Sequence, residues 1–163
     1  MSKISTLADA FYEELQDMYG AEKQLLRALP KMVKQASSDE LKKAFNEHLE
    51  QTKNQVQRIE QAFEETGKSA KSKKCEAMAG LIKETEEMMK EDMEEEVSDA
   101  VLVGMAQKVE HYEIATYGTL CTWAKALGYS SAKMLLGQNL DEEEKTDKLL
   151  TKMSGRVNAH ANA

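Results

Sequence analysis

The sequence predicts an all-α protein folded as a four-helix bundle, and three observations lead to this fold class. Aromatic residues make up 6% of the 163 residues, and the chain has one proline. Glu, Lys, Leu, Ala and Met dominate while β-branched runs are scarce, which favours helices over strands. Four long segments repeat apolar residues at the spacing of an amphipathic helix. We expect one domain over residues 1–154 and a flexible C-terminal tail over residues 155–163.

The first long helix is expected to begin at a cap formed by Ser5 or Thr6, with Asp9 in its first turn. Its apolar stripe is interrupted at one core position by Glu22. A buried carboxylate is costly unless it is paired, protonated or bound to a metal. Pro30 is expected to kink this helix or to end its first part.

The second long helix is expected between a cap at Ser37 and a stop at Gly67. His48 and Thr52 are the polar residues on its apolar stripe. Glu50 lies on the opposite face of the same helix, where we expect it to be solvated.

Residues 68–74 are basic, small and polar, which predicts a loop, and residues 75–90 predict a shorter amphipathic helix. A third long helix follows and ends at Gly128. Glu113 falls inside its apolar stripe, and Glu110 lies at the border of that stripe, one turn away.

The fourth long helix is expected to begin at a cap formed by Ser130 or Ser131. Glu143 and Asp147 interrupt its apolar stripe. Because they are four residues apart, they share one face of the helix.

The connections between the helices predict the topology of the bundle. The first and second helices should form a hairpin, as should the third and fourth, because the links within these pairs are short. The link of about 30 residues between the hairpins is long enough to return along the bundle, which is the ferritin-like topology. An up-and-down bundle with a decorated loop is the alternative.

The polar residues on the four apolar stripes form the candidate metal site. Carboxylates on facing helices together with a histidine suit iron or manganese, in a centre that holds two ions in its full form. The candidate ligands are Glu22, His48, Glu110, Glu113, Glu143 and Asp147. A purely structural polar layer is the alternative. Tyr19 and Tyr112 are candidates for hydrogen bonds near the site, with ordinary core packing as the favoured interpretation.

Charge and cysteine content limit the partners and the location. The net charge of −7 argues against nucleic acid and anionic membrane surfaces as partners. No apolar run is long enough to span a membrane. We expect no secretory signal, because no charged start followed by an apolar run is present. The two cysteines form no recognisable framework, so we expect reduced thiols and a cytoplasmic location.

Four motifs resemble the YciF/YciE-type ferritin-like stress proteins of bacteria. The motifs are YGAEKQLLRALPKM from residue 19, HLEQTKNQ from residue 48, QKVEHYEIATYGTL from residue 107 and EEEKTD from residue 142. The resemblance covers about residues 5–152 and implies a ferritin-like bundle with an extra short helix, cytoplasmic and commonly dimeric. It also implies a role in stress response and matches the six candidate ligands. The family often has a glutamate where this chain has Gln51, which removes one carboxylate.

Two functional hypotheses follow. In the first, the chain is a redox metalloprotein, a metal-dependent oxidoreductase or peroxidase that acts on dioxygen or peroxide as small oxidant substrates. In the second, it is a non-catalytic helical homodimer that serves as an interaction or scaffold protein under stress, and its polar layer fixes the packing register. Nothing in the sequence specifies an iron-storage shell.

Overall fold

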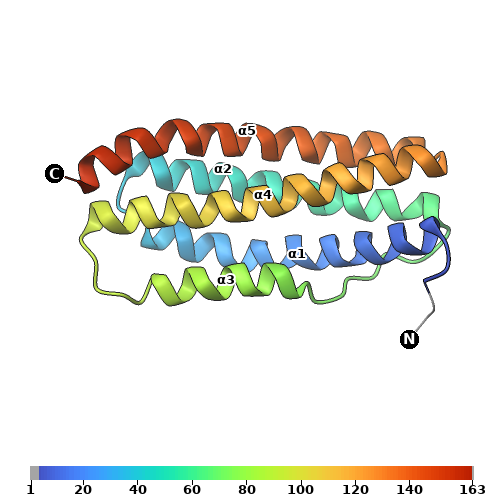
Figure 1. The fold of residues 1–163 in the computed structure, drawn as a ribbon, viewed down its shortest axis with the longest axis horizontal. Helices are drawn as coiled ribbons and strands as arrows, with labels where there is room; N and C mark the ends of the chain where they lie inside the picture. The colour runs from blue at the N-terminus through green and yellow to red at the C-terminus, as the bar shows by residue number, and fades with distance from the viewer. Residues whose placement is uncertain (1–3, 163) are drawn as a thin grey trace.

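The computed structural model describes residues 4–162 as five α-helices and one short 3₁₀ helix, with no strand in that range (Figure 1). The elements are α1 (Leu7–Gln35), α2 (Asp39–Ala62), η1 (Phe63–Thr66), α3 (Glu76–Met88), α4 (Glu95–Leu127) and α5 (Ser130–Ala161). The all-α class is therefore confirmed. Pro30 lies inside α1 and does not end it.

Helices α1, α2, α4 and α5 form the four-helix bundle, in which α1 and α5 each pack against both α2 and α4. Short turns join α1 to α2 and α4 to α5, so each pair is a hairpin. The link over residues 67–94 carries α3 back along the outside of α1 and α4, and α4 then runs parallel to α2 (Figure 1). This is the predicted ferritin-like topology, and the up-and-down alternative is wrong.

Close contacts with α1 hold the crossover segment in place. A β-carbon at Gly20 would lie 1.7 Å from the carbonyl oxygen of Lys73, so only glycine allows this approach. One turn further along α1, the Gln24 side chain accepts a hydrogen bond from Cys75 N at 2.9 Å and donates one to Cys75 O at 3.1 Å. These contacts fix the point at which α3 begins.

Side-chain caps set the ends of α1 and α2. Thr6 and Asp9 form a capping box at the start of α1, as expected for this pair. At the turn before α2, the buried Asp99 of α4 accepts hydrogen bonds from the backbone N–H groups of Ser37 and Ser38, both at 2.8 Å. Asp99 therefore ties the α1–α2 turn to the start of α4.

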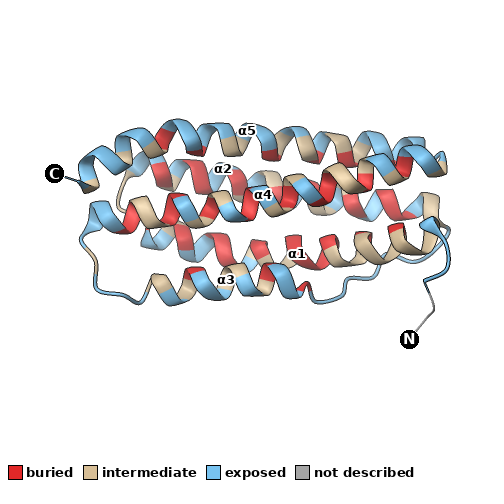
Figure 2. Cartoon of the chain, in the orientation of Figure 1, coloured by how far each residue is buried: buried red, intermediate tan, exposed pale blue. Residues whose placement is uncertain are grey.

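Figure 2 shows that buried residues follow the inward faces of the four long helices. The largest fully buried apolar and aromatic side chains include Phe11, Leu15, Leu25, Leu41, Ile59, Leu102, Tyr117 and Leu120. Within residues 4–162, no helix has the length and apolar character that crossing a membrane requires.

The segment expected to form a flexible C-terminal tail is helical over its described residues. Helix α5 continues through Gly155 to Ala161. Met153 is buried just before this segment, and the Arg156 guanidinium pairs with Glu40 near the start of α2. These contacts attach the last turns of α5 to the bundle, which the local sequence does not indicate.

Candidate metal centre

Five ionisable side chains from all four bundle helices meet in the interior. Glu22 comes from α1, His48 from α2, Glu110 and Glu113 from α4, and Glu143 from α5. None has more than 4% of its surface exposed. Each occupies an inward position of an otherwise apolar helix face, so the folding of these stripes against one another brings the five groups together.

Four of these residues form a tight group that can hold one ion. One ligand atom from each of His48, Glu110, Glu113 and Glu143 lies within 4.8 Å of all the others. His48 Nε2 is 3.3 Å from Glu110 Oε1, and His48 Nδ1 is 3.9 Å from Glu143 Oε2. Neither ring nitrogen has a hydrogen-bond partner. The imidazole therefore stands between two carboxylates without being hydrogen-bonded to either.

Buried polar atoms without hydrogen-bond partners concentrate at this place. Such atoms are rare in folded proteins, and each calls for a specific explanation, such as an ion or a water. The unpaired atoms are Glu22 Oε2, both ring nitrogens of His48, Gln55 Oε1, Glu110 Oε2, both carboxylate oxygens of Glu113 and both of Glu143. Carboxylate oxygens with one imidazole nitrogen match the ligand preferences of iron and manganese. The residues present therefore fit an iron or manganese ion.

The electrostatics of the carboxylates also favour a cation. Burial raises the pKa of Glu22, Glu110 and Glu113 well above the ordinary glutamate value, and the negative charge of Glu143 raises all three further. Three carboxylates are thus destabilised in their charged form unless a cation joins them. A bound divalent ion compensates this repulsion and selects the ionised form.

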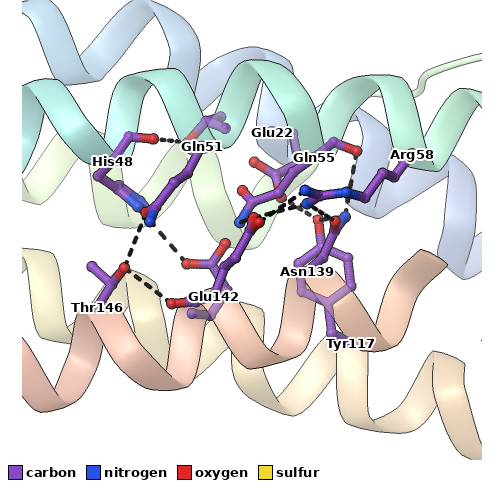
Figure 3. A network of polar contacts seen from close by, with 11 residues as sticks. Glu22, His48, Gln51, Gln55, Arg58, Tyr117, Asn139, Glu142 and Thr146 are labelled. Carbon is purple, nitrogen blue, oxygen red and sulfur yellow. Dashed lines mark hydrogen bonds and ion pairs between the residues drawn. The ribbon is translucent and has the colours of Figure 1, made fainter. Parts of the chain in front are cut away.

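A hydrogen-bond network holds Glu22 through Oε1, the carboxylate oxygen that has a partner. The Tyr117 hydroxyl donates to Glu22 Oε1, and Asn139 Nδ2 donates to the Tyr117 oxygen at 3.0 Å. Asn139 Oδ1 in turn accepts from Arg58 at 2.9 Å, and Arg58 forms a two-pronged ion pair with Glu142, with both distances at 2.8 Å (Figure 3). The network therefore leads from the buried carboxylate to a half-buried ion pair between α2 and α5.

Asp147 does not join the buried group in the described structure. Its carboxylate lies 3.3 Å from Nε2 of the exposed His111 and 3.4 Å from Gln107 Nε2, and 21% of its side chain is exposed. Four residues along a helix add about 40° of rotation to the direction of Glu143. This rotation turns Asp147 from the bundle axis toward the outer face of α4.

The two tyrosines named from the sequence form their hydrogen bonds elsewhere. Tyr19 donates to Glu60, and Tyr112 contacts the Cys75 thiol at 3.0 Å and Asp17 at 3.1 Å. The phenol beside the group is that of Tyr117. The sequence does contain an indication of this, because Tyr117 lies four residues after Glu113 and hence on the same face of α4.

Three polar residues of α2 have partners outside the four-residue group. Gln55, named above for its unpaired Oε1, donates from Nε2 to Glu142 at 3.1 Å. Gln51, where the resembled family often has a carboxylate, accepts a hydrogen bond from Thr146 at 3.3 Å and is not in the four-residue group. Glu50 is exposed and pairs with Lys53, as its outward position predicts.

Comparison with known proteins gives the family. A family model described as a domain of unknown function (DUF892) matches residues 6–162. Protein YciF of Escherichia coli K12 is 48% identical over 152 residues, which cover 93% of this chain and 92% of YciF. The crystal structure of this E. coli stress protein matches with a TM-score of 0.91 at 46% identity, covering 94% of this chain and 98% of that one.

Two further structures extend the comparison. YcfI of Rhodopseudomonas palustris matches with a TM-score of 0.89 at 42% identity, over 91% of this chain and 95% of that one. That protein is described provisionally as a structural protein. A two-domain protein of Anabaena variabilis with DJ-1/ThiJ/PfpI-like and ferritin-like domains matches with a TM-score of 0.61 at 18% identity, over 98% of this chain and 39% of that one, which shows the fold alone. The chain therefore belongs to the DUF892 family and is a relative of the E. coli stress protein YciF.

Proposed function

We propose that this protein binds iron or manganese, as one or two ions, within the bundle and that the loaded protein reacts with dioxygen or peroxide in a stress response. The observation that supports this is the convergence of nine buried, unpaired polar atoms in one place. Leaving a single buried polar group without a partner costs about 1–3 kcal/mol. Nine such atoms in one place therefore need a common partner. A cation is the partner that also offsets the repulsion among the carboxylates.

The chain supplies ligands for two neighbouring positions. His48, Glu110, Glu113 and Glu143 would hold one ion, since their ligand atoms already lie together. Glu22 Oε2, which has no hydrogen-bond partner, would serve a second ion. Bound iron or manganese would supply one-electron redox chemistry toward dioxygen or peroxide.

Residues around the ligands orient them and exclude water. Tyr117 and Asn139 fix one oxygen of Glu22 and leave the other free for a cation. The Arg58–Glu142 ion pair closes the border between α2 and α5. Such supporting hydrogen bonds commonly set ligand orientation and metal affinity.

Metal analysis separates this proposal from the scaffold alternative. Protein purified without chelator or histidine tag should contain about one or two iron or manganese ions per chain. Glu113→Ala should abolish binding and remain a folded bundle, whereas the exposed Glu50→Ala should bind as the unmodified protein does. Absence of metal even after anaerobic loading would favour the helical scaffold, in which the polar layer only fixes the packing register.

We further propose that the protein is a cytoplasmic homodimer that does not bind nucleic acid. The charge of −7 supports the last point, and kinship with a bacterial stress protein is consistent with the location. Met89 and Trp123 pack against the core of their own chain. The large apolar side chains left most exposed for a dimer contact, among the described residues, are those of Ile4 and Met134. Sedimentation at micromolar concentration tests the dimer, and a monomer would contradict it.

A further inference from the structure

The two ends of the candidate metal centre differ in chemical character. The network through Tyr117, Asn139 and Arg58 lies toward the end of the bundle where α5 begins. Toward the end where α5 finishes, a small cavity adjoins His48 and Glu110. The centre therefore has a hydrogen-bonding side and a second side formed by the cavity.

All four bundle helices line this cavity, each with three residues. Nine of the twelve lining residues are apolar, and the three others are His48, Glu110 and Thr146. The Thr146 hydroxyl already bonds to Glu142 O and to Gln51 Oε1. The polar atoms free to face an occupant therefore belong to the two metal-ligand candidates, and the remaining wall is apolar.

The size and position of the cavity suit one small molecule. The cavity volume, counted as the space open to the centre of a water-sized sphere, is about 20 Å³. This is enough for one molecule about the size of water. Leu149, with 40% of its surface exposed, lines it and marks the side nearest to solvent. Ala106 and Phe45 line it from the buried side.

We propose that this cavity binds a small apolar molecule, dioxygen in the working protein, and delivers it to the His48–Glu110 side of the centre. Dioxygen forms no strong hydrogen bonds in water and loses little on entering an apolar cavity. Hydrogen peroxide is both donor and acceptor, so it would lose hydrogen bonds there. The inference rests on the proposed function and narrows its substrate from dioxygen or peroxide to dioxygen by this route.

Xenon tests the binding step without metal or turnover, because it is an apolar atom that occupies such cavities. A crystal of the full chain under xenon pressure should show xenon between Phe45, Ala106 and Leu149. Ala106→Leu should remove it by filling the space, whereas Ala115→Leu, on the exposed face of α4, should retain it. Absence of xenon in the unmodified protein, or equal occupancy in Ala106→Leu, would overturn the proposal.

Iron oxidation then tests the occupant. In iron-loaded protein, Ala106→Leu should slow oxidation by dioxygen about tenfold while changing oxidation by hydrogen peroxide much less, since the space holds one small molecule. Leu149→Trp, which covers the cavity from the side nearest to solvent, is the second variant in case Ala106→Leu folds poorly. It should also slow oxidation by dioxygen more than oxidation by hydrogen peroxide. Equal slowing with both oxidants would overturn the dioxygen assignment. A protein that takes up no metal would instead refute the proposed function, and with it the assignment, whatever the xenon result.

Discussion

The hydroxyl of Tyr117 donates a hydrogen bond to Glu22 Oε1, and both side chains are completely buried. The phenol is itself fixed by Asn139, so one carboxylate oxygen has a rigid partner while the other has none. Burial raises the pKa of Tyr117 well above its ordinary value, and the negative charge of Glu22 raises it further. The phenol therefore stays a hydrogen-bond donor while it positions Glu22.

Tyr117→Phe should weaken metal binding. Removal of the hydroxyl leaves Glu22 Oε1 without a donor, and loss of such a supporting bond lowers metal affinity by about 10- to 100-fold. The metal-free protein should lose about 1–3 kcal/mol of stability, because Asn139 Nδ2 also loses a partner. Tyr12→Phe is the matched control, since the Tyr12 hydroxyl bonds to Ser69 O outside the site. Competition titration with a chelator measures the affinity, and equal affinities in the two variants would refute a positioning role for Tyr117.

Asp147→Asn should change metal affinity by less than about threefold, because this side chain faces His111 and Gln107 rather than the four-residue group. Glu143→Gln, one turn away on the same helix, should reduce affinity by at least about a hundredfold. The comparison uses the same titration. A large loss in Asp147→Asn would show that Asp147 moves into the centre when metal binds.

Gly20→Ala should destabilise the protein by about 3 kcal/mol, because the new β-carbon would overlap the Lys73 carbonyl oxygen and displace the crossover segment. Gly104→Ala is the control. This exposed glycine of α4 has nothing within 4 Å of a β-carbon, and alanine there should stabilise by about 0.5–1 kcal/mol. Urea unfolding measures both changes. A neutral Gly20→Ala would mean that the crossover does not pack this closely.

Metal-free protein should become more stable on mild acidification. The folded-state pKa values of Glu22, Glu110 and Glu113 are raised, so the folded chain binds more protons than the unfolded chain above the ordinary glutamate value of about 4.3. Stability from these groups is therefore largest at low pH and is lost as pH rises through the raised values. His48 and Glu143 face the same groups from α2 and α5.

Metal reverses this dependence, because it binds the ionised carboxylates and competes with protons. Between about pH 7.5 and about pH 5.5, denaturant melts should show rising stability for metal-free protein and falling stability for metal-loaded protein. Parallel responses in the two forms would show that the carboxylates do not surround a metal ion.

Much of this site could be predicted because a charged residue on an apolar helical stripe is conspicuous. Glu22, His48, Glu113 and Glu143 were identified in that way, and Glu110 by its place one turn from Glu113. Asp147 lies beside the four-residue group rather than in it. The sequence could not show this, because a shared helical face is about 100° wide and the pattern does not indicate which edge of that face meets the partner helix.

Other features depend on contacts between distant parts of the chain. A tyrosine such as Tyr117 on a stripe is equally compatible with ordinary core packing, so its role appears only when Glu22 is seen opposite it. Arg58 meets Glu142, which lies 84 residues later. The length of the crossover predicted its return along the bundle, but its contact with Gly20 could not be read from either segment alone.

Anomalous diffraction from crystals of the manganese-loaded protein tests the central claim most directly, because it locates the ion rather than inferring it from binding. We expect a peak inside the bundle, bonded to atoms of His48, Glu110, Glu113 and Glu143, and its loss in Glu113→Gln but not in Glu50→Gln. No peak in the bundle interior, with manganese found only at exposed carboxylates, would contradict the account.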